Sequence, residues 1–308
     1  MAVSSEHETA LFHQHPPSVA VDEAAQTELN LDNCDLHTVP AQIARLTNLR
    51  LLSLYHNRLA ALPDTLGALR ALRVLNVAEN QLTTLPATLG ELTALQMLDV
   101  GHNQLTTLPA SLAKLHALVF LYASNNQLRE VPVALQALRA LRYLNLTDNQ
   151  LTALPIWIGA LTGLVELRLY NNQLAALPEP IGALPHLHEL HLMRNRLMAL
   201  PASLGELTGL RLLDLQDNAL VALPPTIGKL QKLTTLNLRY NRLTALPDTV
   251  GQMVNLRFLD LRANQLTTLP AALADLPHLE KLDLRWNRLA ARPSWVAQLE
   301  AKGCLVYL

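Results

Sequence analysis

One pattern of apolar and polar positions repeats along almost the whole chain, without insertion or deletion. Asparagine recurs every 23 residues from Asn57 to Asn287, and Cys34 stands one period before the first of them. A proline lies six residues after each of these twelve positions, from Pro40 to Pro293. A constant period of this length predicts a single repeat array, although 308 residues would otherwise suggest two domains.

Each unit predicts a short β-strand, a turn and a return segment. In the unit that starts at residue 233, LTTLNLRYNRLTALPDTVGQMVN, the alternation points Leu236 and Leu238 inward and their neighbours outward. The asparagine after the strand, which we call the ladder position, carries an amide that can satisfy backbone groups left unpaired at the turn. The LP pair then starts a short helical or 3-10 return, because proline restricts its own backbone and that of the leucine before it.

The skeleton of this unit, LxxLxLxxNxLxxLPxxhGxL, resembles the leucine-rich repeat. Its LPxxIGxL half is similar to the 23-residue class of animal Ras-pathway scaffolds, plant intracellular Ras-group repeat proteins and many bacterial proteins. The resemblance covers about residues 26 to 308. It implies an α/β solenoid: a horseshoe of twelve 23-residue coils, with a parallel β-sheet on the concave face and short helical or 3-10 turns on the convex side. The resemblance specifies the fold closely and the function only weakly.

The units divide the chain into an N-terminal tail and cap (1–25), a leucine-rich-repeat array (26–301) and a C-terminal capping strand (302–308). Near the end, Leu305 and Tyr307 align with the two inward strand positions of a thirteenth coil. We therefore expect both side chains to point into the core.

Leucine accounts for 75 of the 308 residues, and the repeat assigns this excess to seven inward positions per coil. Burying each such side chain contributes roughly 1.5–3 kcal/mol before opposing terms, so coils must stack to bury them. In seven coils a glycine follows the second inward residue of the return segment, which permits a tight turn or close packing against the next coil. These are Gly67, Gly90, Gly159, Gly182, Gly205, Gly228 and Gly251.

Composition excludes several classes. The net charge is −1, and no apolar run reaches the eighteen or so residues that a membrane span needs. Cys34 and Cys304 lie at opposite ends, which removes a disulfide framework and fits a reducing compartment. The first 25 residues lack the features of a secretory signal. We expect a cytoplasmic protein, monomeric and without a cofactor, and the alanine-rich, near-identical coils suggest a bacterial one.

Unusual residues gather on the predicted concave face. Its columns lie six, four, two and one residues before the ladder position and one after it. Eight of the twelve aromatic residues fall in these columns: Tyr55, Phe120, Tyr122, Tyr143, Tyr170, Tyr240, Phe258 and Trp286. Tyr, Trp and Arg are enriched at interface hot spots, but strands favour aromatics in any case, and solvated faces favour arginine. Both interpretations stay open.

The predicted partner site lies across coils five to twelve, where an aromatic group would anchor a protein or peptide and stacked arginines would orient it. Asp260 and Asp283 stand in the neighbouring column and offer these arginines internal partners. The predicted contacts are Phe120, Tyr122, Tyr143, Arg168, Tyr170, His191, Met193, Arg194, Arg239, Tyr240, Asp260, Arg262, Asp283, Arg285 and Trp286. A polyanion or nucleic acid on the arginine column is the alternative, which the near-neutral total charge disfavours.

Catalytic and metal-binding signatures fail on spacing. No HExxH, GxxxxGK[ST] or GxGxxG motif occurs, and His188 and His191 point to opposite faces of a strand. Cysteine substitutes for asparagine in the repeat, so Cys34 is interpreted as a ladder residue and not as a nucleophile. We therefore predict no catalytic residue, no metal site and a non-catalytic scaffold or adaptor.

Overall fold

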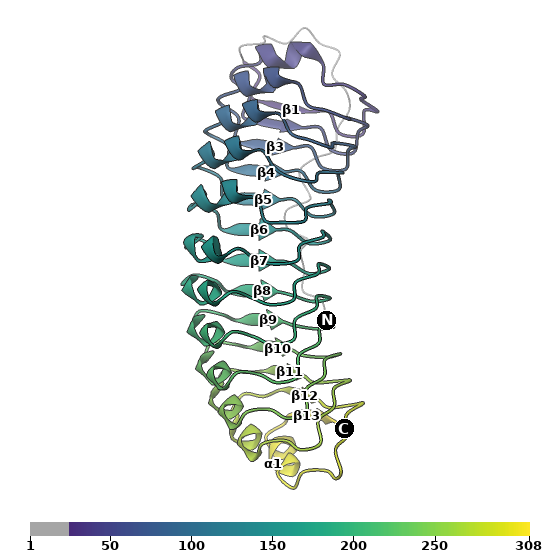
Figure 1. The fold of residues 1–308 in the computed structure, drawn as a ribbon, viewed down its shortest axis with the longest axis vertical. Coiled ribbons are helices and arrows are strands. Elements are labelled where there is room, and N and C mark those ends of the chain that lie inside the picture. The colour runs from purple at the N-terminus through teal and green to yellow at the C-terminus, as the bar shows by residue number, and fades with distance from the viewer. Residues whose placement is uncertain (1–24) are drawn as a thin grey trace.

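The strands lie side by side in chain order and form one open, curved array (Figure 1). The structure is a computed structural model that describes residues 25–308, so the predicted tail and cap at 1–25 falls almost entirely outside it. Within the described part, thirteen parallel strands form a single sheet, and the 3-10 turns follow the outer edge of the arc. The predicted solenoid fold is confirmed.

Each strand has only three residues and pairs with the next one in constant register. From β1 to β12 the paired residues are 23 apart, as in Glu28↔Leu51. The strands are β1 (Glu28–Asn30), β2 (Leu51–Ser53), β3 (Val74–Asn76), β4 (Met97–Asp99), β5 (Phe120–Tyr122), β6 (Tyr143–Asn145), β7 (Glu166–Arg168), β8 (Glu189–His191), β9 (Leu212–Asp214), β10 (Thr235–Asn237), β11 (Phe258–Asp260), β12 (Lys281–Asp283) and β13 (Leu305–Tyr307).

Each return segment is a five-residue 3-10 turn that begins directly after the repeating proline. Pro63, for example, has φ −74° and ψ 147°, an extended geometry that proline favours, and η2 follows it. The turns are η1 (Ala41–Arg45), η2 (Asp64–Ala68), η3 (Ala87–Glu91), η4 (Ala110–Lys114), η5 (Val133–Ala137), η6 (Ile156–Ala160), η7 (Glu179–Ala183), η8 (Ala202–Glu206), η9 (Pro225–Lys229), η10 (Asp248–Gln252) and η11 (Ala271–Asp275). One α-helix, α1 (Val296–Ala301), replaces the last turn.

The seven inward positions form one continuous core through the array. In the unit around Asn149, the inward leucines Leu144, Leu146 and Leu151 are fully buried. Equivalent positions are buried in almost every coil, so the stacking that the periodicity predicted does enclose the leucine side chains.

The ladder asparagines satisfy backbone groups of two neighbouring coils. The side-chain amide of Asn149 donates to the carbonyls of Ala123 (3.0 Å), Leu146 (3.2 Å) and Thr147 (3.0 Å), and its oxygen accepts the N–H of Leu128 (2.9 Å). The three carbonyls also accept from Asn125, Asn126 and Asn172, so the N–H of Leu128 is the group that depends on this side chain alone within the described residues.

Cys34 occupies the ladder position of the first coil, as predicted. Its thiol donates to the carbonyl of Asp32 (3.4 Å), and its backbone N–H donates to the side chain of Asn57 (3.1 Å). Cys34 is exposed, unlike most of the later asparagines, because it lies at the open end of the described ladder.

The repeating glycines are required by contact with the next coil. A Cβ on Gly205 would lie 2.3 Å from the carbonyl oxygen of Thr226, and all seven glycines face a backbone oxygen at under 3.0 Å. At these seven positions the backbone of the next coil thus occupies the space that a side chain would need.

The prediction for Leu305 and Tyr307 is wrong by one residue. β13 pairs with β12 through Lys281↔Leu305 and Leu282↔Val306, an offset of 24. Val306 therefore packs against the core, and Leu305 and Tyr307 point outward with 59% and 39% exposure. The helix α1, which ends at Ala301 and is followed by Gly303 at φ +89°, adds one residue to the path and shifts the register.

Candidate partner-binding face

The outward columns share one surface, which we call the strand face: the side chains six, four, two and one residues before each ladder position and one after it. Every predicted contact from Phe120 to Trp286 belongs to one of these columns, and none is part of the hydrophobic core. Their surroundings nevertheless differ between the middle of the array and its C-terminal end.

The column one residue before the ladder position has left-handed backbone, which the sequence analysis missed. In the first coils it holds residues that tolerate this geometry, such as Asn33 and His56. Farther along, bulky Tyr240 (φ 56°) and Trp286 (φ 63°) occupy the same position. This backbone carries both aromatic side chains outward, where they are 49% and 64% exposed.

The column four residues before the ladder position has a structural role that was also missed. Its Asp or Asn side chain accepts the backbone N–H two residues later, as Asp214 does from Gln216 (3.0 Å) and Asp260 from Arg262 (3.1 Å). Tyr122, Arg168 and His191 stand in this column and have no carboxylate or amide to accept that bond. At these three residues of the predicted middle group, the side chain therefore cannot accept the backbone N–H two residues later in the same way.

In the middle group, on β5–β8, the aromatic and charged side chains contact one another. The ring centroids of Tyr122 and Tyr143 are 4.7 Å apart, and the Arg168 guanidinium carbon lies 5.4 Å from the Tyr143 ring. Phe120 is 6.4 Å from Tyr143, and Tyr170 is partly buried beside this cluster. Burial raises the pKa of the Tyr143 hydroxyl. These aromatic residues meet as predicted, but none of them is exposed.

Two glutamates and one histidine join the middle group from neighbouring coils. His191 Nε2 lies 3.1 Å from a carboxylate oxygen of Glu189 and 3.7 Å from one of Glu166, and Arg168 contacts Glu166 directly. The hydrogen bond with His191 lowers the pKa of Glu189. These three ligand atoms are close enough to hold a metal ion, but Arg168 already supplies positive charge to the cluster.

The spacing of residues along a single strand does not reveal this cluster. The cluster forms between strands, where Glu166 and Glu189 are cross-strand partners. Met193 and Arg194 follow β8, the first partly buried and the second exposed at φ 51°.

The C-terminal group is open. Tyr240, Phe258 (40% exposed) and Trp286 are exposed, and Tyr307 joins them because of the register shift at β13. The Arg285 guanidinium carbon lies 5.7 Å from the Trp286 ring and 5.1 Å from the Tyr307 ring, so the aromatic and basic side chains form one surface.

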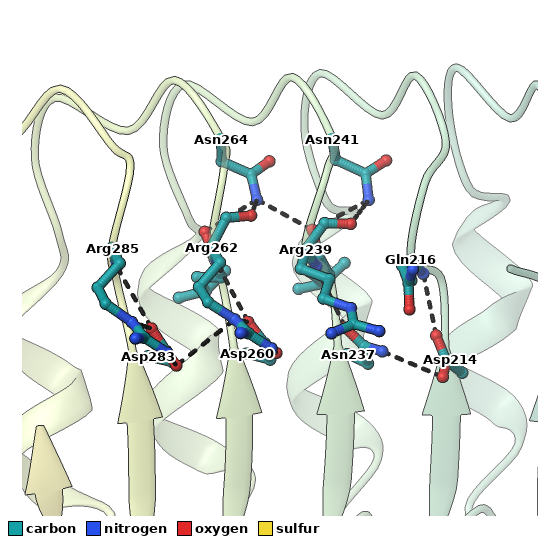
Figure 2. A network of polar contacts seen from close by, with 12 residues as sticks. Asp214, Gln216, Asn237, Arg239, Asn241, Asp260, Arg262, Asn264, Asp283 and Arg285 are labelled. Carbon is teal, nitrogen blue, oxygen red and sulfur yellow. Dashed lines mark hydrogen bonds and ion pairs between the residues drawn. The ribbon is translucent and has the colours of Figure 1, made fainter. Parts of the chain in front are cut away.

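Two of the three stacked arginines have the internal partners that were predicted. Arg262 Nε donates to Asp260 (2.9 Å), and Arg285 Nε donates to the fully buried Asp283 (2.9 Å). Asp283 also lies 3.4 Å from Arg262, which links the two pairs (Figure 2). Burial opposes ionisation of Asp283, but its bonds from Arg285 prevail and lower its pKa.

Arg239, the third arginine, has no such partner. The residue two positions before it is Asn237, whose side-chain amide donates to Asp214 on β9 (3.1 Å). Figure 2 shows the Arg239 guanidinium beside Asn237 with no bond drawn to a carboxylate. Its Nε is buried and has no hydrogen-bond partner.

A basic pocket of about 770 Å³ lies beside the strand face, where β9–β12 begin. Arg211, Lys232, Arg257 and Lys302 contribute to its lining, together with the carboxylate of Glu280, which contacts Arg257 (2.6 Å). None of the predicted contacts lines this pocket, so it is separate from the predicted site.

Comparison with family models matches leucine-rich repeats over residues 27–82, 70–128, 185–243 and 231–289, with a further repeat at 140–161. Comparison with curated proteins finds no match. Within residues 25–308, no helix is long and apolar enough to cross a membrane.

Among solved structures, the chain is similar to a leucine-rich-repeat protein of Leptospira interrogans, with 32% identity and a TM-score of 0.68 over 92% of this chain and 84% of that one. It is also similar to the TDR receptor (27% identity, TM-score 0.78), covering 85% of this chain and 48% of that one. A plant peptide hormone receptor, RGFR1, solved in complex with RGF2, matches with 26% identity and a TM-score of 0.66, covering 85% and 51%. The chain spans about half the length of these two receptors.

Proposed function

Because the chain belongs to the leucine-rich-repeat family, whose members typically serve as protein-interaction domains, we propose that it is a non-catalytic scaffold or adaptor. Its partner is a protein or peptide that lies on the strand face across β5–β12. The observation that carries this proposal is the set of exposed aromatic side chains beside arginines on one face of the sheet.

The middle and C-terminal groups have different parts in this proposal. The C-terminal aromatics offer large apolar area at the surface, which is the chemistry of interface hot spots. The middle group presents a surface whose shape is fixed by its own ring contacts and ion pairs. A partner therefore makes its main contacts over β10–β12 and also packs on the preformed surface over β5–β8.

The arginine pairing disfavours a polyanion as the partner. Arg262 and Arg285 already contact Asp260 and Asp283, and those carboxylates would repel the phosphates of a nucleic acid. We therefore keep protein binding as the proposal.

Cytoplasmic location, bacterial origin and a monomeric state belong to the same proposal. Cys34 and Cys304 are both free, which suits a reducing compartment. Sedimentation of the purified chain would test the monomer, and fractionation of the source cells would test the location.

The proposal is tested by capturing partners from a lysate of the source cells with the immobilised chain and identifying them by mass spectrometry. The double variant Tyr240→Ser/Trp286→Ser should lose the captured proteins. A matched variant, Val133→Ser/Ile156→Ser, removes apolar residues of equal or greater exposure from the return turns and should retain them. Equal capture by both variants would contradict binding on the strand face.

A further inference from the structure

The arginine column contains one cation, Arg239, that makes no ion pair within residues 25–308. Arg262 and Arg285 each donate to the aspartate two residues earlier, whereas the corresponding residue for Arg239 is Asn237. Asn237 has no carboxylate to offer, and its amide is engaged with Asp214. Arg239 therefore combines a full positive charge with a buried Nε that finds no acceptor.

The nearby carboxylates are already occupied. Asp214 accepts the Gln216 backbone N–H (3.0 Å) and the Asn237 amide, and Asp260 is bonded to Arg262 through both oxygens. No carboxylate in residues 25–308 lies within ion-pair distance of Arg239. Because Arg239 is only partly buried as a whole, its guanidinium can offer its terminal N–H donors to a group that approaches the strand face.

We propose that Arg239 is the docking point for a single carboxylate of the partner, held beside apolar side chains that contact Tyr240, Phe258 and Trp286. The inference rests on the proposed function, since it places one chemical group of the strand-face partner. The three aromatics are exposed and lie on the same face as Arg239, so an acidic residue flanked by apolar ones complements this part of the sheet.

A phosphate-bearing partner fits this site less well. A nucleic acid would bring several charges at short spacing along the column, and Asp214, Asp260 and Asp283 lie on the strands around Arg239. Within residues 25–308, Arg239 is the one arginine of the column without an ion pair, so one carboxylate matches the charge that is available.

The fold supplies a variant that would fill this site internally. Asn237→Asp recreates beside Arg239 the pair that Asp260 makes with Arg262, in a column where β9, β11 and β12 already carry aspartate. Arg239→Gln removes the cation instead. Arg129→Gln makes the same charge change at an exposed residue outside the strand face and serves as the control.

The experiment selects binders to the full chain from a phage-displayed library of random peptides. Bound peptides should be enriched in Asp or Glu next to aromatic or aliphatic residues. Synthetic copies should bind at least about tenfold more weakly to Asn237→Asp and Arg239→Gln, and equally to Arg129→Gln. Replacing the peptide's acid by its amide should weaken binding to the parent chain and change little in either variant.

Each other outcome overturns a distinct statement. Peptides that need Tyr240 and Trp286 but show no acidic preference, or that bind Asn237→Asp as tightly as the parent, would overturn the carboxylate site and leave strand-face binding intact. Peptides that bind regardless of Tyr240 and Trp286, or no binders at all, would contradict the proposed function as well. Tighter, Arg239-dependent binding of a single-stranded oligonucleotide would replace the carboxylate by a phosphate.

Discussion

The middle of the strand face and its C-terminal end are built from the same residue types and differ in whether those residues satisfy one another. On β5–β8, Tyr143 packs against Tyr122 and lies under Arg168. Arg168 pairs with Glu166, and His191 contacts Glu189. On β10–β13 the aromatics are exposed, and Arg239 makes no ion pair with any carboxylate of the described residues. Composition alone therefore does not identify a binding surface. The two regions differ in whether their aromatic and charged side chains already contact one another or stay exposed to a partner.

The largest expected effect comes from truncating the exposed aromatics. The triple variant Tyr240→Ala/Phe258→Ala/Trp286→Ala should weaken binding of a strand-face partner by about 100-fold or more, because each residue is a candidate hot spot worth roughly 1–2 kcal/mol. Its thermal unfolding midpoint should stay close to that of the parent. Titration calorimetry and thermal unfolding measure the two quantities.

The matched triple in the middle, Phe120→Ala/Tyr122→Ala/Tyr143→Ala, should affect thermal stability more than partner binding. These rings are partly buried against one another, so their removal should lower the unfolding midpoint more than that of the C-terminal triple. A middle triple that loses binding without losing stability would break the contrast between the regions.

The second prediction compares ladder residues in the two regions. Asn149→Ala should reduce the free energy of unfolding by about 2–3 kcal/mol, because the N–H of Leu128 loses its acceptor in a site closed to water and three carbonyls each lose one of two donors. Asn287→Ala, at the more accessible end, should cost about half as much, because water can reach the freed groups. Urea unfolding measures both, and equal costs would show that the end of the ladder is as closed as the middle.

The third prediction uses two aspartates of one column whose pKa shifts have opposite signs. Burial raises the pKa of Asp99 from 3.8 to about 6, since no arginine lies beside it to offset the burial. The folded state therefore binds this proton more tightly than the unfolded chain, and stability falls as pH rises from about 4 to 6. Asp99→Asn should stabilise the chain at pH 7 by about 1–3 kcal/mol, a gain that disappears below about pH 4.

Asp283 should show the reverse, because its bonds from Arg285 outweigh burial and lower its pKa. The stability it provides is present above its ordinary pKa and is lost as pH falls through the lower folded value. Asp283→Asn should therefore destabilise the chain at pH 7, and the deficit should shrink in acid. Urea unfolding of both variants from pH 3 to 8 tests the two predictions. If the free energy of unfolding changed with pH in the same way for Asp99→Asn and Asp283→Asn, the opposite pKa shifts would be contradicted.

Much of the fold could be predicted because it depends on period and side-chain volume. The alternation around Leu236 and Leu238 gave the inward positions, the spacing of Asn149 and its equivalents gave the ladder, and the position of Gly205 gave the contact between coils. The inward positions repeat throughout the array and the glycine recurs in seven coils, so a single sequence contains many copies of the same signal.

The remaining features depend on departures from the period. The position of Tyr307 required knowing that α1 takes one residue more than a 3-10 turn, and a fixed repeat does not report that difference. The left-handed backbone of Tyr240 and Trp286 was hidden because these residues rarely adopt it. The cluster of Glu166, Glu189 and His191 needs two adjacent coils to be compared column by column.

The partner site could be predicted only as a set of columns. The column pattern predicts that Tyr122, Tyr143 and Arg168 are neighbours, but their mutual contacts depend on ring geometry. The same limit applies to Arg239, whose missing partner became apparent beside the paired Arg262 and Arg285.

A crystal structure of the chain bound to its tightest library-selected peptide tests the central claim most directly. The account predicts that the peptide lies on the strand face over β10–β12, with apolar side chains against Tyr240 and Trp286 and a carboxylate within hydrogen-bond distance of Arg239. A peptide bound along the return turns, in the basic pocket beside β9–β12, or over β5–β8 alone would contradict it.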